Sequence, residues 1–520
     1  MTGRGTGRAA RRGSPGATGD RVRVVVVGGG ASGWMTAAAL RKLVPQACEV
    51  TLVESEAIGI IGVGEATLPH LRGFNARLGI DEADFMSATK ATFKLGIQFE
   101  NWGRIGDRYV HPFARFGRDV RDVPFHHFWT RAMREGLAPG DLQDYCLPVA
   151  MCRRNLFAPP SQQADRVEAS FGYAYQFDAN LYAPFLRQLA EAAGVRRVEG
   201  KIVQVEQDTR SGAVDAVLLD DGRRVGGDLF IDCSGFRSLL IGETLGEPFE
   251  DWSRWLPCDR AVAAPSPGRG PIAPYTSAIA QSAGWRWRIP LQHRVGNGYV
   301  HASAFVDEQT AIDTLVAALE APPLVEPRIL RFTAGRRRRA WVSNVVSIGL
   351  ASGFLEPLES TSLYLIQAAI TQLLESFPER RIADVDREAF NRAMAFEYDR
   401  ARDFLILHYH ATERDDSAFW RHVRTMPVPD SLVERLELFR ARGRIQPQDR
   451  GLFQEPSWLA VLIGQRVVPG GYDARVGAMP AKVLSHSLGR MLTDLGAALG
   501  RMPSHEHYLA SYCPAGDLRA

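Results

Sequence analysis

The sequence predicts an α/β fold with a parallel sheet, and three stretches lead to this prediction. Near the N-terminus, the β-branched run 24–27 leads into the glycine-rich segment 28–33, after which residues 34–43 have the composition of a helix. Residues 229–237 (LFIDCSGFR) and 345–354 (VVSIGLASGF) are hydrophobic runs that enter glycine-containing turns. Such uninterrupted apolar runs are typical of strands buried on both faces of a parallel sheet.

The first of these stretches also predicts a dinucleotide site. Segment 28–33, GGGASG, has the spacing GxGxxG, which allows a tight turn, close approach of backbone to a pyrophosphate and packing of a helix on a strand. A second strand, 49–54, ends at Glu54, 21 residues after Gly33, where an acidic side chain can bind a ribose hydroxyl. The residues expected at a dinucleotide in this Rossmann-type unit are Gly28, Gly30, Ala31, Ser32, Gly33 and Glu54.

The two later hydrophobic runs favour FAD over NAD. Their order after the first GxGxxG is similar to that of the FAD-dependent monooxygenases, in which corresponding segments return to the first sheet and contact the cofactor. The alternative is that 229–237 and 345–354 are simply central strands of a parallel sheet. We therefore expect a FAD-binding domain of the flavin monooxygenase kind, followed by a helical C-terminal part.

Length and composition set the broad class. At 520 residues the chain exceeds a single typical core. We expect a disordered tail at 1–20, a FAD-binding and catalytic domain with a discontinuous sheet at 21–400, and a mostly helical, substrate-side subdomain at 401–520. With 45% hydrophobic and 23% charged residues, the composition is that of a soluble globular protein.

Charge, cysteine spacing and hydropathy exclude several classes of partner. A formal net charge of +3 is nearly neutral for this length, so no nucleic-acid partner is expected. The six cysteines show no CxxC spacing, which argues against a zinc site or a disulfide framework; we expect no metal. No run of eighteen apolar residues and no secretory signal is present, so a cytoplasmic protein without a membrane span is expected.

The most specific motif is GWRWRIP at 284–290. In an extended segment Trp285 and Trp287 point to the same side; taken alone, the motif fits an ordinary half-buried strand ended by Pro290. The same chain also carries GVGEATLP at 62–69 and PLESTS at 357–362. Together these motifs resemble the flavin-dependent halogenases of the tryptophan halogenase family, in which WxWxIP is a signature, and the similarity covers roughly residues 21–470.

This resemblance implies halogenation of an aromatic, indole-type substrate. Reduced FAD (FADH2) and O2 would give a flavin hydroperoxide, chloride or bromide would convert it to hypohalous acid, and this oxidant would reach a lysine beside the substrate. The FADH2 would come from a separate flavin reductase. Two alternatives stay open: a FAD-dependent aromatic monooxygenase that hydroxylates its substrate, and a flavin-binding protein without turnover.

The resemblance also implies the catalytic residues. Lys94 lies in ATFKLGIQFENW (91–102), which is similar to the family segment with the catalytic lysine; Lys90 competes for the role on sequence grounds. Apolar neighbours lower the pKa of a lysine and make its amine reactive. Glu359, favoured over Glu356, is expected as the acid near Lys94, with Ser360 beside it.

The remaining site residues follow from the same motifs. The family places halide at the backbone amides of Thr361 and Ser362, although glycine is common at the second position. The alternative is that Ser360 or Thr361 is the N-cap of the helix that begins near Leu363. The two roles are compatible, because the backbone N–H groups at a helix start are themselves an anion site. The further residues expected at the cofactor are Gly64, Ala66, Leu350 and Leu363, and those expected at the substrate are Pro69, His111, Phe113 and Phe453.

One segment departs from the family pattern. The stretch expected to close over the substrate, 448–463, is short, has no Tyr-Tyr pair and offers only Phe453 and Trp458 as aromatic faces. An indole without the amino-acid head, or a larger indole-bearing molecule, fits such an open pocket better than free tryptophan. Beyond Pro480, apolar positions at helical spacing predict a packing helix. Regiochemistry, chloride or bromide preference, and monomer or homodimer are left open.

Overall fold

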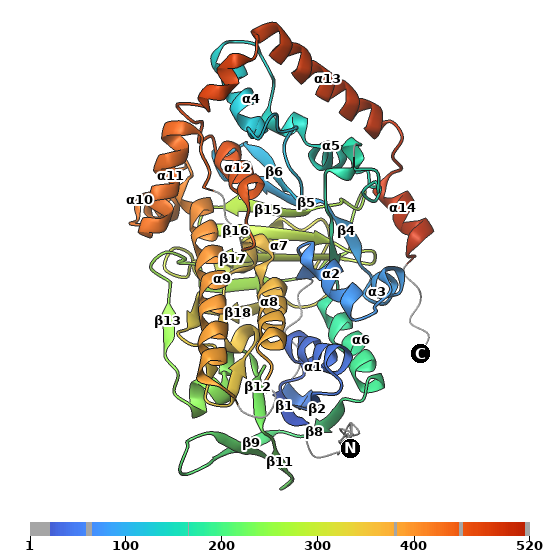
Figure 1. The fold of residues 1–520 in the computed structure, drawn as a ribbon, viewed down its shortest axis with the longest axis vertical. Coiled ribbons are helices and arrows are strands. Elements are labelled where there is room, and N and C mark those ends of the chain that lie inside the picture. Colours follow the sequence, from blue (N-terminus) through green and yellow to red (C-terminus); the bar gives the residue numbers. More distant parts are fainter. Residues whose placement is uncertain (1–20, 59–64, 165, 379–381, 447–450, 515–520) are drawn as a thin grey trace, which may run out of the picture.

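The computed structural model describes residues 21–58, 65–164, 166–378, 382–446 and 451–514. The expected tail at 1–20 and the expected cofactor residue Gly64 lie outside these ranges. Within them, two large sheets lie one beyond the other along the molecule (Figure 1).

The first sheet is the predicted nucleotide-binding sheet and has six strands in the order β20-β21-β12-β1-β2-β8. All neighbours are parallel except β20 and β21. Alternate residues of β1 contact different cores: Val24 and Val26 belong to the main core, and Val25 and Val27 to a second, smaller one. The strands are β1 (Val22–Val27), β2 (Cys48–Glu54), β8 (Arg196–Glu199), β12 (Leu229–Asp232), β20 (Trp341–Val342) and β21 (Val345–Ser347).

The second sheet has seven strands in the order β18-β14-β17-β16-β15-β5-β6, and only β15 and β5 pair in parallel. The motif GWRWRIP forms β16 in its middle and ends at Pro290, as predicted. Trp287 fits because the opposite residue on β17 is Gly298, where a Cβ would lie 2.0 Å from the indole ring. The strands are β5 (Gly96–Glu100), β6 (Arg108–Pro112), β14 (Arg260–Ala263), β15 (Thr276–Gln281), β16 (Gly284–Pro290), β17 (Val295–His301) and β18 (Arg328–Arg331).

Three small sheets complete the strands, and one of them carries Lys94. This sheet has the order β3-β7-β4, with β3 (Glu65–Ala66), β4 (Thr92–Lys94) and β7 (Ala174–Phe177). The others consist of β9 (Ile202–Gln207), β10 (Val214–Leu219) and β11 (Arg224–Gly226), and of β13 (Phe249–Asp251), β19 (Gly335–Arg337) and β22 (Gly353–Phe354).

Helices cover the sheets and make up most of the C-terminal part. As predicted, the described residues beyond 410 form helices and no strand. Helix α9 runs without a break through residue 400, where the sequence analysis placed a domain boundary. The helices are α1 (Ala31–Leu43), α2 (His70–Arg77), α3 (Glu82–Ala88), α4 (Phe125–Arg134), α5 (Leu147–Arg154), α6 (Ala179–Ala192), α7 (Glu308–Ala317), α8 (Thr361–Glu375), α9 (Asp384–His410), α10 (Ala418–Thr425), α11 (Asp430–Arg442), α12 (Glu455–Gly464), α13 (Ala481–Leu499) and α14 (His505–Tyr512). Among the described helices, none is both long and apolar enough to cross a membrane.

The predictions for two later segments have different outcomes. As predicted, the run 345–354 is a strand that enters a glycine turn: β21 ends at Ser347, and the positive φ of Gly349 (+76°) turns the chain into a short 3₁₀ helix. Helix α13 packs as predicted through buried Leu484, Leu488, Leu495, Ala498 and Leu499, but not at every apolar position of the pattern. The apolar residues Val483 and Leu492 are 49% and 39% exposed, because the apolar stripe that α13 buries is narrower than its sequence pattern.

Candidate active site

The glycine loop between β1 and α1 has the geometry of a dinucleotide site. A Cβ at Gly28 would lie 2.2 Å from the carbonyl oxygen of Cys233, and a Cβ at Gly33 would lie 1.8 Å from that of Gly28, so both positions require glycine. By contrast, a Cβ at Gly30 would meet no atom within 4 Å. Open space therefore lies at the N-terminal end of α1, where backbone N–H groups favour a phosphate, and the loop fits the pyrophosphate of FAD.

Glu54 ends β2 beside this loop. Its carboxylate accepts hydrogen bonds from Arg197 Nε (2.5 Å) and from Trp34 Nε1 (3.3 Å). A Cβ at Gly29 would lie 1.5 Å from the Oε2 atom of Glu54, so the carboxylate and the loop are in close contact. The acidic group thus lies beside the glycine loop, with a cationic partner, Arg197, that sequence spacing did not indicate.

The other expected cofactor residues come from distant segments. Leu350 lies in the 3₁₀ turn 349–351, and a Cβ at Gly349 would lie 2.8 Å from the Cβ of Ser32, so this turn packs on the start of α1. Leu363 is buried in the first turn of α8. Ala66 is buried in β3 and pairs with Gln176 of β7.

Lys94 is fully buried at the end of β4. Its Nζ atom donates hydrogen bonds to the carbonyl oxygen of Thr67 and to Ser360 Oγ, both at 2.9 Å, and lies 5.4 Å from the centre of the Phe113 ring. Burial lowers the pKa of Lys94 to about 7, against the opposing effect of the Glu359 and Glu65 charges. The amine is thus partly neutral near neutral pH, whereas an exposed lysine is almost fully charged.

Glu359 lies between two histidines and is also fully buried. Both of its oxygens are 3.0 Å from His111 Nδ1, and Oε1 is 2.8 Å from His408 Nε2. Burial alone raises the pKa of this carboxyl, but the charges and hydrogen bonds of His111 and His408 outweigh burial and lower the pKa to about 2. Glu359 is therefore ionised.

His408 was not among the residues predicted from the sequence, and it contacts two acceptors. Its Nδ1 atom lies 2.8 Å from the carbonyl oxygen of Phe404, which can only accept a hydrogen bond. Its Nε2 atom faces the ionised Glu359, which also only accepts. Both ring nitrogens of His408 thus face acceptors, and the ring is a second contact, besides His111, that holds the buried carboxylate of Glu359. The signal for His408 was a histidine within an apolar helical run.

Glu356, the competing acid, has a different environment. Its Oε1 atom accepts hydrogen bonds from Trp285 Nε1 (3.0 Å) and Tyr409 OH (2.6 Å), so a tryptophan of the GWRWRIP motif holds it. Its Oε2 atom is buried without a partner among the described residues. Burial raises the pKa of Glu356 to about 7. Glu356 is thus held by an indole N–H and a hydroxyl, and Glu359 by two histidines, although both acids are buried.

The start of α8 places Ser360 at the N-cap but gives its side chain a different partner. Ser360 occupies the N-cap position with φ of 58°, but its side chain makes no capping hydrogen bond and accepts from Lys94 instead. Thr361 and Ser362 follow as the first helical residues, where backbone N–H groups lack intrahelical partners. The Thr361 hydroxyl is buried and has no partner in the described part of the chain. Such groups at a helix N-terminus are of the kind that binds an anion.

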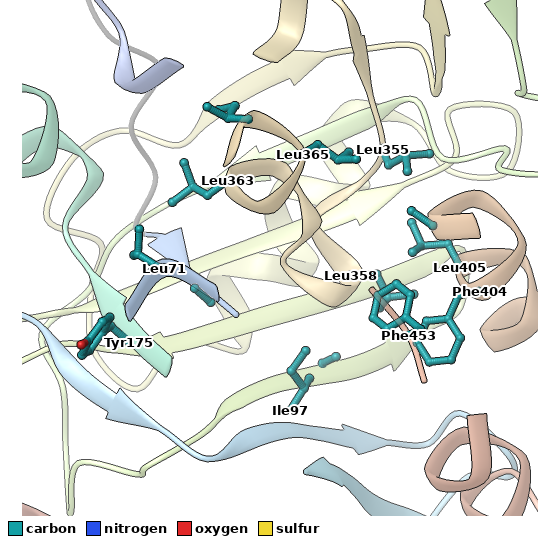
Figure 2. Close-up of a cluster of buried hydrophobic side chains, with 14 of the residues drawn as sticks. Leu71, Ile97, Tyr175, Leu355, Leu358, Leu363, Leu365, Phe404, Leu405 and Phe453 are labelled. Atoms are coloured by element: carbon teal, nitrogen blue, oxygen red, sulfur yellow. The ribbon is translucent and has the colours of Figure 1, made fainter. Parts of the chain in front are cut away.

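The four residues expected at the substrate line one cavity of about 1010 Å³. Pro69, His111 and Phe113 come from the N-terminal half of the chain, and Phe453 precedes α12. The Phe453 ring stacks on Phe404 of α9 with centres 3.9 Å apart (Figure 2). Trp458 packs edge-on against Phe404 and does not line this cavity. His111 thus contacts both Glu359 and the cavity.

Comparison with known proteins decides the family. The tryptophan halogenase family model matches residues 23–481. The chain belongs to the tryptophan halogenase family. Among curated relatives, tryptophan 7-halogenase RebH of Lentzea aerocolonigenes is 35% identical over 88% of this chain and 92% of its own. Members of this family are flavin-dependent halogenases, so the protein is an oxidoreductase that halogenates an aromatic substrate.

Solved structures of family members agree with this assignment. Xcc4156, a flavin-dependent halogenase from Xanthomonas campestris, has a TM-score of 0.92 and 48% identity, covering 95% of this chain and 99% of its own. BrvH, a flavin-dependent halogenase from Brevundimonas sp. BAL3, has a TM-score of 0.91 and 44% identity, covering 95% and 100%. The predicted fold class, a flavin-binding α/β domain with a helical C-terminal part, is confirmed.

Proposed function

We propose that this family member is a FADH2-dependent halogenase of indole-type substrates in which Lys94 delivers the halogen. The observation that carries the proposal is the position of Lys94: it is fully buried, it is bonded to Ser360, and it lies against Phe113 of the large cavity. A buried amine with a pKa of about 7 is a nucleophile that an oxidised halogen can modify.

When bound, reduced FAD would supply hypohalous acid from O2 and chloride or bromide. The residues that would hold FAD are those of the glycine loop, Glu54 and the turn with Leu350, and the N-terminus of α8 at Thr361 and Ser362 would hold the halide. The FADH2 would come from a separate flavin reductase. We also propose a cytoplasmic enzyme, monomeric or homodimeric, with a catalytic domain at 21–400 and a substrate-side subdomain at 401–520.

Around Lys94, the chain supplies a nucleophile, a group that orients it and a negative charge. The neutral amine attacks the halogen of hypohalous acid, so that an N–halogen bond forms, the halogen–oxygen bond breaks, and the departing hydroxide leaves as water with the amine proton; alternatively, the amine hydrogen-bonds the intact hypohalous acid. Ser360 accepts a hydrogen bond from Nζ and so fixes the direction of the amine. Glu359 stays ionised between His111 and His408, and its negative charge stabilises the cation that develops on the aromatic ring.

The substrate ring would lie among Pro69, His111, Phe113 and Phe453. Aromatic faces and a proline favour a flat apolar ring. An indole without the amino-acid head, or a larger indole-bearing molecule, is proposed over free tryptophan because the segment before α12 offers the cavity a single aromatic ring, Phe453. Tryptophan, which the relative RebH halogenates by its name, is the natural comparison substrate.

The test is mass spectrometry of indole incubated with the protein, FAD, a flavin reductase, NADH and either chloride or bromide. Lys94→Ala is expected to lower the halogenated product at least about 100-fold, as loss of a group that acts on the reacting atoms does. Lys90→Ala is the matched control and should keep the product, because Lys90 lies four residues before Lys94, in the turn that precedes β4.

Three other results would each contradict a part of this proposal. A hydroxylated indole without halogen would favour the aromatic monooxygenase, the second candidate. Equal halogenation by wild type and Lys94→Ala would contradict the role of Lys94. If tryptophan were halogenated with a higher kcat/KM than indole-3-propionate, its analogue without the amino group, the proposal of an indole without the amino-acid head would be wrong.

A further inference from the structure

The cavity continues well beyond the proposed ring site. Phe113, beside Lys94, and Phe453 line one part, while Arg490 and Asp494 of α13 line another. A volume of about 1010 Å³ is at the upper end of the range that encloses drug-sized ligands. An indole ring therefore fills only part of this space, and the rest extends to α13, at the end of the molecule farthest from the first sheet (Figure 1).

The charged side chains that line the cavity are mostly cationic. Two of its four arginines are already paired: Arg115 contacts Asp119 at 3.4 Å, and Arg166 contacts Glu168 at 2.8 Å. The two aspartates of the lining are Asp119 and Asp494. Of the charged residues in the lining, Arg115, Arg166 and Asp119 thus already have ion-pair partners.

The unpaired charges lie at the exposed rim. Arg118 and Arg490 are exposed, and within the described ranges neither takes part in an ion pair or side-chain hydrogen bond. Asp494, four residues after Arg490 on α13, is likewise exposed and forms no ion pair there. The rim thus keeps two guanidinium groups against one carboxylate. A guanidinium group binds carboxylate or phosphate oxygens in a bidentate manner.

We propose that the substrate is an aromatic ring with an anionic arm, in which the ring lies beside Lys94 and the anionic group binds Arg118 and Arg490. This inference rests on the proposed function and specifies its substrate class. The arm accounts for the part of the cavity that indole leaves empty, and the anion accounts for the excess positive charge at the rim. The shared chemistry is a carboxylate or a phosphate.

The first test compares arms of different charge. Indole-3-acetate, indole-3-propionate and indole-3-butyrate are each set against the primary amide of the same length, and indole-3-alkyl phosphates separate phosphate from carboxylate. For the best arm length, the anion should have a kcat/KM about ten-fold above its amide, because each exposed pair contributes about two- to five-fold. The gain should appear in KM and decline at high ionic strength.

The second test uses variants outside the catalytic machinery. Arg118→Ala with Arg490→Ala should remove the preference for the anion and leave indole halogenation unchanged, whereas the double lysine variant should keep part of the preference. Asp494→Asn should act in the opposite direction and tighten binding of the anion about two-fold. Calorimetric binding of the same acids and amides to the enzyme with oxidised FAD, without reductase, gives a readout independent of turnover.

The outcomes separate the two proposals. Equal kcat/KM and equal affinity for acids and amides in the wild type, or equal losses for both in the double alanine variant, would overturn the anionic arm while indole halogenation continued. Failure of the wild type to halogenate indole or any of these compounds would contradict the proposed function itself. An anion effect that survives the double alanine variant would place the anion elsewhere and overturn the assignment to the rim.

Discussion

At the scale of single residues, the surroundings of Lys94 favour its neutral form, whereas those of Glu359 favour its charged form. Both side chains are fully buried, and burial alone drives each toward its neutral form. Lys94 Nζ is hydrogen-bonded to two neutral acceptors, Thr67 O and Ser360 Oγ, so burial determines the direction of its pKa shift. Glu359 meets two histidines, so their charges prevail. One site thus contains a partly neutral amine near an ionised carboxylate.

The pKa of about 7 at Lys94 leads to a pH prediction. A lysine is neutral above its pKa, so if the neutral amine takes up the halogen, the single-turnover rate of indole halogenation should rise from pH 6 to pH 8 with a midpoint near 7. Lys94→Arg, which stays charged throughout, should lose the activity at every pH. A rate that falls over this range would mean that the ammonium form is the active one.

At the scale of elements, β16, α9 and the segment between β22 and α8 meet at Glu356. Trp285 donates from β16 and Tyr409 donates from α9, both to Glu356 Oε1. Glu356 lies three residues before Glu359, so these two donors hold the segment that presents Glu359 and Ser360 to the site. This contact gives the GWRWRIP motif a physical role in fixing that segment.

Replacement of Glu356 tests this role. Glu356→Gln keeps an oxygen that accepts from Trp285 and Tyr409, so stability should change by less than about 1 kcal/mol and halogenation should persist. Glu356→Leu leaves two buried donors without a partner and should cost about 2–4 kcal/mol, measured as the free energy of unfolding. Equal losses in the two variants would show that the negative charge, and not the hydrogen bonds, is required.

At the scale of the whole molecule, the C-terminal helix supports the strand that carries Lys94. His505, the first residue of α14, accepts a hydrogen bond from the Phe93 backbone N–H at Nε2 (3.2 Å). It donates from Nδ1 to the carbonyl oxygen of Ile272 (2.9 Å). This pattern requires a neutral ring, and burial lowers the pKa of His505 to about 4. The end of the chain thus fixes β4, more than 400 residues away in sequence.

This contact predicts acid sensitivity. Because the pKa of His505 is lowered in the folded state, its contribution is fully present above the unfolded value of about 6.5 and is lost as the pH falls toward 4. The loss should reach about 3 kcal/mol. His505→Gln, whose amide can make both contacts without titrating, should flatten the pH dependence of the unfolding midpoint between pH 7 and pH 5. The same slope in both proteins would contradict this origin.

Sequence patterns were sufficient for the local architecture. The β-branched run, the GxGxxG spacing and Glu54 predicted β1, α1, β2 and their order, because each depends on residues close together in the chain. The Trp285 and Trp287 motif predicted a strand ended by Pro290 for the same reason. By contrast, the side chain of Ser360 at the N-cap of α8 makes no capping hydrogen bond, since it accepts from Lys94, a tertiary partner that local propensity does not indicate.

By itself, the sequence determined the nucleotide fold, the halogenase family and the candidate residues Lys94 and Glu359. Only the tertiary structure decided their chemistry. The partners of Glu359 lie 248 and 49 residues away in sequence, and the side-chain partner of Lys94 lies 266 away. No periodicity relates such positions, because contact across this separation depends on how sheets and helices pack. Burial and charge, which set the protonation of each group, follow from that packing alone.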